Sequence, residues 1–104
     1  MVGKYKVVTL CGSTRFKDDF IKAQEDLTLA GNIVIPVCFF GSASQEITPV
    51  VKSMLDDIHK RKIDMADEIF VINRDGYIGE STKAEIDYAQ KAGKSIVYMF
   101  GGTL

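Results

Sequence analysis

Glu85 is the carboxylate whose surroundings in the sequence best suit chemistry. It follows an apolar run at 69–72 and a loop punctuated by Gly76 and Gly79, and the spacing places it near the start of a predicted helix over 82–92. A helix that begins after a strand presents unpaired N–H groups and the positive end of its dipole, so it favours anionic ligands. A carboxylate beside such a ligand can act as a nucleophile or a base.

Two interpretations of Glu85 are open on spacing. The T-K-A-E segment at 82–85 matches the capping box, in which the glutamate bonds back to the N–H of the cap residue. Glu85 also shares a predicted helical stripe with Tyr88 and Ala89, which we expect to face inward. A carboxylate on a buried stripe at the edge of a sheet suggests function. Spacing alone favours the cap.

A second candidate segment, Gly12-Ser13-Thr14-Arg15, follows the strand predicted at 6–11. Glycine allows the backbone to approach a ligand, the hydroxyl and N–H groups can hold oxyanions, and arginine offers a planar fork for phosphate or carboxylate. The structural alternative is a plain turn in which Ser13 or Thr14 caps the next helix and Arg15 is solvated. The segment is neither a Walker loop nor a GxGxxG fingerprint.

His59 and the cysteines are the remaining residues with reactive side chains. His59, the only histidine, falls between Leu55 and Ile63 on the predicted inward stripe of a helix. A core histidine is the favoured interpretation, and a site histidine is the alternative. Cys11 and Cys38 have neither CxxC nor zinc-site spacing, so we expect buried free thiols, with a disulfide as the weaker alternative, and no metal and no cofactor.

The composition limits the possible classes of protein. The chain of 104 residues suits a single domain over 1–104, and its 46% hydrophobic and 26% charged residues are ordinary for a soluble globular protein. Its net charge of −1 creates no field that favours a nucleic acid polymer or a membrane. We expect no signal peptide and no membrane span, and the free thiols favour a cytoplasmic location.

Alternating apolar runs and helical spacing predict an α/β fold. Continuous apolar strands separated by helices indicate a parallel sheet, and right-handed crossovers favour a flavodoxin-like or Rossmann-like doubly wound sheet of about four strands in the order 2-1-3-4. Ligands of such folds bind beyond the carboxyl ends of the strands, which gathers 12–15, 38–40 and 73–81 at one edge. The predicted strands are 6–11, 32–37, 68–73 and 95–100, and the predicted helices are 14–29, 48–66 and 82–92, with a polar loop at 41–46.

Two segments together resemble the nucleoside 2-deoxyribosyltransferase superfamily. One is L-C-G-S-T-R at 10–15, and the other runs from A-D-E-I-F-V-I at 66–72 through a glycine-bearing loop to A-E-I-D-Y-A at 84–89. The A-G-K-S-I ending at 92–96 is also similar, and the resemblance spans most of the chain. The C-G-S-x-R start is closest to the branch of 2′-deoxynucleoside 5′-monophosphate N-glycosidases.

The resemblance implies a mechanism and assigns residues to it. Glu85 would attack C1′ of the sugar, releasing the base and leaving a glycosyl ester that water or a second base resolves. His59 stands where the family usually has an aspartate that assists the base, and it could serve as the acid because an ordinary histidine pKa is near neutral. The residues implied to bind the substrate are Gly12, Ser13, Arg15, Tyr77, Gly79 and Ser81.

The expected partner is a nucleoside or a nucleoside 5′-monophosphate. We also expect a homodimer or larger homo-oligomer, because the family commonly assembles and Val50, Met54 and Ile58 leave apolar surface on a helix. A non-catalytic nucleotide-binding module on the same fold is the alternative. A phosphate-binding flavodoxin-like domain unrelated to nucleosides is a third hypothesis.

Overall fold

The computed structural model contains one sheet of four parallel strands and describes residues 1–40 and 47–101. The strands are β1 (Val7–Gly12), β2 (Ile33–Ile35), β3 (Glu68–Ile72) and β4 (Ser95–Tyr98), and they lie in the order β2-β1-β3-β4. The predicted α/β doubly wound fold and its strand order are therefore confirmed. The polar loop predicted at 41–46 lies outside the described residues.

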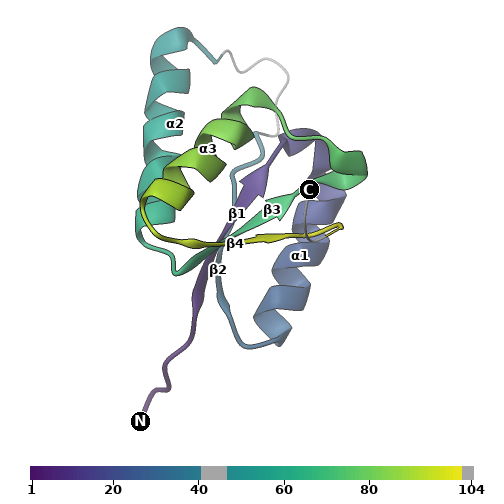
Figure 1. Ribbon diagram of the computed structural model, residues 1–104, viewed down its shortest axis with the longest axis vertical. Coiled ribbons are helices and arrows are strands. Elements are labelled where there is room, and N and C mark those ends of the chain that lie inside the picture. The colour runs from purple at the N-terminus through teal and green to yellow at the C-terminus, as the bar shows by residue number, and fades with distance from the viewer. Residues whose placement is uncertain (41–46, 102–104) are drawn as a thin grey trace.

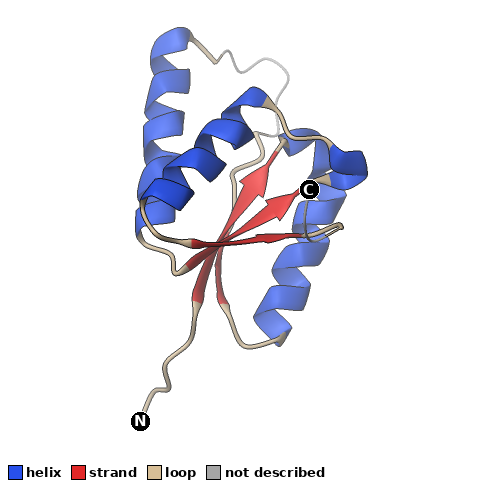
Figure 2. Ribbon diagram, in the orientation of Figure 1, coloured by secondary structure: helices blue, strands red, loops and turns tan. Residues whose placement is uncertain are grey.

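Helices cover both faces of this sheet (Figures 1 and 2). The helices α2 (Pro49–Asp64) and α3 (Glu80–Lys91) lie on one face, and α1 (Lys17–Leu29) lies on the other. A short 3₁₀ turn, η1 (Thr14–Phe16), connects β1 to α1, and a second, η2 (Arg74–Gly76), follows β3. The helix predicted over 14–29 therefore begins with a tighter turn than an α-helix has.

Side chains of β1 alternate between two apolar clusters, one on each face of the sheet. On the α1 face, Leu10 packs with Phe20. On the opposite face, Cys11 packs with Ile63 of α2 and Ala89 of α3. All five are at most 2% exposed, and burying a large apolar side chain contributes about 1.5–3 kcal/mol. Because successive residues of a strand point to opposite faces, Cys11 faces the two helices α2 and α3.

Pro36 ends β2 early. Proline has no N–H to donate to a neighbouring strand, so the ladder between β1 and β2 ends at the Thr9–Ile35 pair. The strand predicted over 32–37 is therefore shorter in the structure than in the prediction. The chain after β2 leaves the sheet and crosses toward α2.

Gly12 ends β1 in close contact with β3. A Cβ at this position would lie 2.9 Å from the Ile72 Cβ and 3.0 Å from the Ile72 carbonyl oxygen, and the φ of +151° is one that other residues rarely adopt. Only glycine lets the two strands approach this closely at the edge where ligands of the fold bind.

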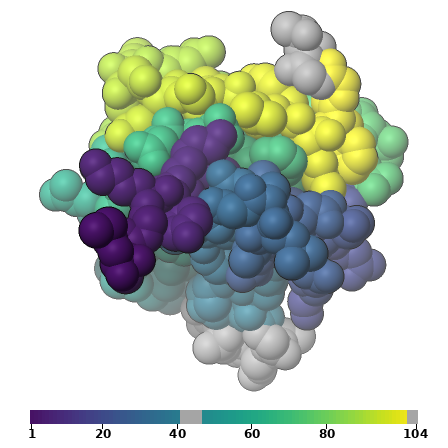
Figure 3. Space-filling model, turned by 90° about the horizontal axis from the view of Figure 1, so that it is seen from below, coloured from purple at the N-terminus to yellow at the C-terminus, as the bar shows by residue number. Residues whose placement is uncertain are grey.

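The amino-terminal edge of the sheet carries the start of the chain. Figure 3 views the molecule from this side, and the purple N-terminal segment lies beside blue residues around β2. The Ile33 N–H donates to the Lys6 carbonyl at 2.9 Å, which joins the two segments. The edge predicted to bind ligands lies at the opposite ends of the strands.

The exposed surface of α2 is partly apolar. Val50, Met54 and Ile58 are exposed there, as the oligomer prediction requires, and the predicted homo-oligomer stays a prediction. None of the helices in the described part of the chain has the length and apolar character needed to cross a bilayer.

Asp19 in the first turn of α1 and Arg74 in η2 form a bidentate ion pair. The Arg74 Nε and Nη2 groups donate to the two Asp19 carboxylate oxygens at 2.6 and 2.8 Å. Asp19 is buried, and its hydrogen bond with the guanidinium lowers the pKa of the carboxyl group. The pair ties the helix after β1 to the loop after β3, so it fixes the two segments that flank the ligand edge.

We expect Asp19→Asn to lower Tm at neutral pH, because the substitution takes the charged partner from Arg74. The lowered native pKa means that the pair stabilises the fold above the unfolded carboxyl pKa of about 3.9, and that this stabilisation is lost as the pH falls through the native pKa. The Tm difference between the variant and the unsubstituted protein should therefore shrink in acid. Thermal unfolding followed by circular dichroism at neutral and acid pH measures it.

Asp26→Asn is the matched control, because Asp26 forms an exposed ion pair with Lys22 on the surface of the same helix. Its Tm should change little at either pH, since exposed pairs within one helix contribute a few tenths of a kcal/mol at most. Equal losses in the two variants, or a loss in Asp19→Asn that is the same at every pH, would contradict the role given to the Asp19–Arg74 pair.

Candidate functional site

A cleft of about 420 Å³ opens at the carboxyl ends of β1 and β3, where the topology predicts a ligand site. Its walls come from the loop after β1, the segment after β2, the helix α2 and the start of α3. The predicted site residues that line it are Gly12, Ser13, His59, Tyr77, Gly79, Ser81 and Glu85. The fold thus brings most of the predicted set to one cavity.

Arg15 is the exception among the predicted site residues. It does not line the cleft in the part of the chain that the structure describes. Its guanidinium lies 4.2 Å from the centroid of the Tyr77 ring, and Tyr77 itself lines the cleft. The Ser13 side chain accepts a hydrogen bond from the Arg15 N–H at 3.4 Å and caps η1. The capping alternative is therefore right for Ser13, and Arg15 stacks on Tyr77.

The capping-box interpretation of Glu85 is wrong. The helix α3 begins at Glu80 with Gly79 as its N-cap, so Thr82 is the third helical residue and Glu85 the sixth, counting from Glu80. A capping box needs its hydroxyl residue at the N-cap and its glutamate at the third helical position. The hydroxyl of Thr82 made the helix seem to start two residues late, whereas Thr82 is buried inside the first turn.

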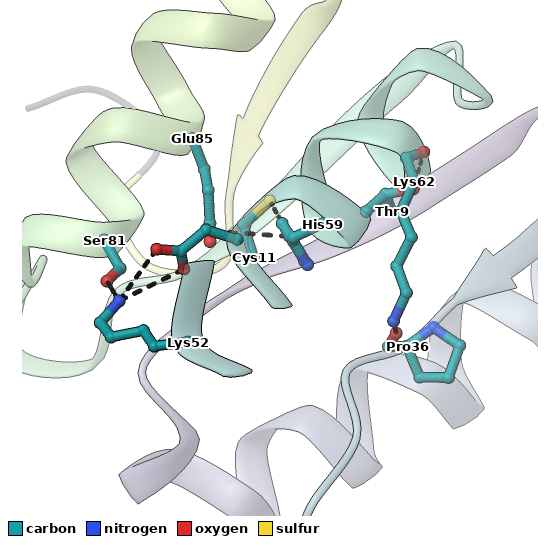
Figure 4. A network of polar contacts seen from close by, with 9 residues as sticks. Thr9, Cys11, Pro36, Lys52, His59, Lys62, Ser81 and Glu85 are labelled. Carbon is teal, nitrogen blue, oxygen red and sulfur yellow. Dashed lines mark hydrogen bonds and ion pairs between the residues drawn. The ribbon is translucent and has the colours of Figure 1, made fainter. Parts of the chain in front are cut away.

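Glu85 reaches a buried thiol and a buried imidazole (Figure 4). The His59 Nε2 atom lies 3.3 Å from the Cys11 Sγ and 3.6 Å from the Glu85 Oε1. These side chains come from three different elements, β1, α2 and α3. Cys11 is fully buried, and the His59 and Glu85 side chains are 11% and 17% exposed. His59 is therefore both a packed core residue and a residue of the cleft.

Burial controls the protonation of this cluster. It raises the pKa of Glu85 to about 7, and a hydrogen bond with the Cys11 thiol partly offsets the rise. It lowers the pKa of His59 to about 4 and raises the pKa of Cys11 well above its ordinary value. Near neutral pH the imidazole is therefore neutral and the thiol is protonated. Only Glu85 is close to its titration point, so its contact with His59 is not an ordinary ion pair.

No family model matches the chain, and no curated protein matches it. The likeness to the nucleoside 2-deoxyribosyltransferase superfamily therefore stays a prediction that depends on the motifs at 10–15 and 66–89. What the cleft can do chemically follows from its donor groups, their burial and their distances.

Several residues in or beside the cleft were not predicted as site residues, among them Cys11, Lys52 and Asp56. Asp56 lines the cleft one helical turn before His59, and it pairs with Lys52 at 3.0 Å. The Lys52 Nζ also lies 3.5 Å from the Ser81 hydroxyl. The Asp56 side chain is half-exposed. Its spacing of three residues from His59 on one helix is the signal that groups the two side chains.

The two phenylalanines after β2 have different roles. Phe39 packs edge-on against Phe20 with ring centroids 5.4 Å apart, so it plugs the sheet edge. Phe40 is half-exposed and lines the cleft. The exposed ring of Phe40 therefore offers the cleft an aromatic surface for stacking.

The exposure of Cys38 differs from the prediction that both cysteines are buried. Both cysteines carry free thiols, as expected, but Cys38 is exposed and Cys11 is buried. The prediction of two buried thiols assumed that the strand at 32–37 continued to Cys38. Because β2 ends at Ile35, Cys38 lies in the segment that lines the cleft.

We expect a thiol reagent such as DTNB to label one cysteine quickly in the folded protein and the second only on unfolding. Cys38 is accessible, whereas Cys11 is fully buried and its raised pKa keeps it in the unreactive thiol form. Thionitrobenzoate absorbance with and without denaturant gives the two rates. Cys38→Ser should remove the fast phase. Equal rates for the two thiols in folded protein would contradict the burial of Cys11.

Proposed function

We propose that the protein cleaves the N-glycosidic bond of a nucleoside or a nucleoside 5′-monophosphate, or transfers the (deoxy)ribosyl group, with Glu85 as the nucleophile. The observation that carries this proposal is the position of Glu85. Its carboxylate lines a cleft at the ligand edge of the sheet, has no capping role and lies mostly buried in contact with a neutral imidazole and a protonated thiol. A carboxylate kept in such a place costs stability when it ionises, which suits a catalytic role better than a structural one.

The chemistry follows the scheme of retaining glycosidases. The Glu85 carboxylate attacks C1′ as the C1′–N bond breaks, and the base leaves with the bonding electrons and takes up a proton from solvent water. The resulting glycosyl ester is then attacked at C1′ by water, giving the free sugar, or by a second base, giving a new nucleoside. A pKa of about 7 leaves a substantial fraction of Glu85 ionised and makes that carboxylate more basic than an ordinary one.

His59 does not fit the acid role that the resemblance implied. That role assumed a pKa near neutral, and burial lowers the pKa of His59 to about 4. A neutral imidazole can accept a hydrogen bond or orient Glu85, but it holds no extra proton for the leaving base. Asp56 lies one turn earlier on the same helix and lines the cleft. We therefore assign Asp56 to the base side of the site and His59 to the positioning of Glu85.

The sugar side of the site is supported by small and hydroxyl-bearing residues. Gly12 and Ser13 end β1 on one wall of the cleft, and Gly79 and Ser81 start α3 on the other. The Lys52 ammonium near Ser81 supplies a positive charge for a 5′-phosphate, a role that the sequence had given to Arg15.

A non-catalytic nucleotide-binding module is the second candidate. The neutral state of His59 favours it, because this histidine cannot protonate a leaving base near neutral pH. The two candidates differ in what they do to a ligand: the enzyme releases free base, and the module binds the intact nucleotide.

We expect Glu85→Gln to reduce base release at least about a thousandfold, because the amide cannot form the glycosyl ester. Folding should survive: above about pH 7 the variant avoids the cost of a buried charge, so its Tm should be no lower than that of the unsubstituted protein. Chromatography of free bases after incubation with mixed nucleosides and monophosphates measures the activity. Asp87→Asn, an exposed carboxylate on the same helix, is the matched control and should keep full activity. Base release that persists in Glu85→Gln would contradict the proposal.

We expect kcat/KM for base release to rise with pH through about 7 and then level off. Glu85 must be ionised to attack, and its pKa is raised to about 7 mainly by burial. The groups that face it are the thiol of Cys11, the neutral imidazole of His59, the Asp56 carboxylate, which raises its pKa, and the Lys52 ammonium, which lowers it. Initial rates between about pH 5 and pH 9 give the profile. A rise centred near the ordinary glutamate pKa would exclude Glu85 as the titrating nucleophile.

A further inference from the structure

Cys11 is the one buried reactive group of the site that the glycosidic mechanism does not use. Its thiol is fully buried and contacts His59, which lines the cleft. Burial keeps the thiol protonated, so it is no nucleophile. The other buried members of the cluster in which Cys11 packs are all apolar side chains. A thiol here, pointing at the imidazole of His59 and the carboxylate of Glu85 (Figure 4), therefore calls for a role of its own.

The three donor atoms lie at the spacing of ligands around one metal ion. Bonds of about 2.3 Å to sulfur and about 2.0–2.2 Å to nitrogen or oxygen, at tetrahedral angles, place neighbouring ligand atoms roughly 3.3–3.6 Å apart. The Cys11 Sγ lies 3.3 Å from the His59 Nε2, and the His59 Nε2 lies 3.6 Å from the Glu85 Oε1. All three atoms lie within 4.8 Å of one another.

We propose that Cys11, His59 and Glu85 form a zinc site whose fourth position opens into the cleft. The donor set contains one sulfur, one nitrogen and one oxygen, which zinc accepts together, whereas magnesium and calcium prefer oxygen alone. His59 and Glu85 both line the cleft, so a water molecule or a ligand atom can occupy the fourth position. Three protein ligands with one open position is the arrangement of reactive rather than structural zinc sites.

Charge balance supports a divalent ion in this mostly buried place. Binding would release the thiol proton of Cys11 and any proton on Glu85, so that two negative ligands and a neutral imidazole neutralise the ion. The cluster therefore takes up zinc without leaving an uncompensated charge in the core. This inference goes beyond the proposed function and does not rest on it. Zinc held by Glu85 would block the attack on C1′, so the proposed function applies to the metal-free protein.

Cobalt titration of the tag-free, reduced protein tests the site directly. Co²⁺ alone should give a near-ultraviolet thiolate-to-cobalt charge-transfer band and strong visible bands of a four-coordinate ion, both complete at one equivalent. Added Zn²⁺ should displace the cobalt and remove both bands. Failure to form the charge-transfer band would overturn the proposal, whatever the outcome of base-release assays.

Three variants identify the ligands. Cys11→Ser should remove the charge-transfer band, and Glu85→Gln should weaken cobalt binding by about tenfold or more, since even loss of a group behind a ligand costs that much. Cys38→Ser is the matched control, because Cys38 is an exposed thiol that also lines the cleft, and it should keep the band. A band that survives Cys11→Ser or disappears in Cys38→Ser would overturn the assignment.

X-ray absorption of the zinc-loaded, unsubstituted protein covers the case in which Cys11→Ser does not fold. We expect one sulfur at about 2.3 Å and lighter ligands at about 2.0–2.2 Å. A first shell made of nitrogen and oxygen alone would exclude Cys11 as a ligand and overturn the proposal.

Discussion

The parallel pairing of β1 with β3 is the constraint on which the rest of the structure depends. Its register sets Cys11 beside Val71 and Gly12 beside Ile72. Because side chains alternate along a strand, this register decides which residue of β1 faces the helices α2 and α3. A slip of one residue would turn Leu10 or Gly12 toward His59 in place of Cys11. The close approach that Gly12 permits keeps the two strands in this register at the point where the cleft opens.

Much of the fold could be predicted because its signals are local. Apolar runs separated by helical spacing identify a parallel sheet, and the handedness of its connections leaves few strand orders. The boundaries of the helices and strands were harder to predict, because the same local sequence pattern can occur at a helix start or inside a helix. The hydroxyl of Thr82 suits an N-cap, yet in the structure it lies buried inside the first turn of α3. Because α3 begins two residues before the predicted start, Glu85 has no capping role, and its carboxylate lines the cleft.

The candidate site was predictable in its location and less so in its chemistry. Topology brought Gly12, Ser13 and Glu85 to one edge without any knowledge of side-chain contacts. The contact between Cys11 and His59 joins residues 48 positions apart, and it depends on the rotation of α2 about its axis. Periodicity could say only that each of these side chains faces inward. The pKa shifts could not be predicted from the sequence either, because they depend on how deeply the packed helices and strands bury each group.

The early end of β2 has a consequence for the shape of the cleft. Beyond the Thr9–Ile35 pair, the chain no longer follows β1, and the Pro36 carbonyl accepts a hydrogen bond from the Lys62 ammonium on α2 at 2.9 Å. The segment that holds Cys38 and Phe40 therefore becomes a wall of the cavity instead of a continuation of the sheet. The Pro36 ring thus stops β2 from continuing alongside β1, and the cleft occupies the space that opens between the two segments.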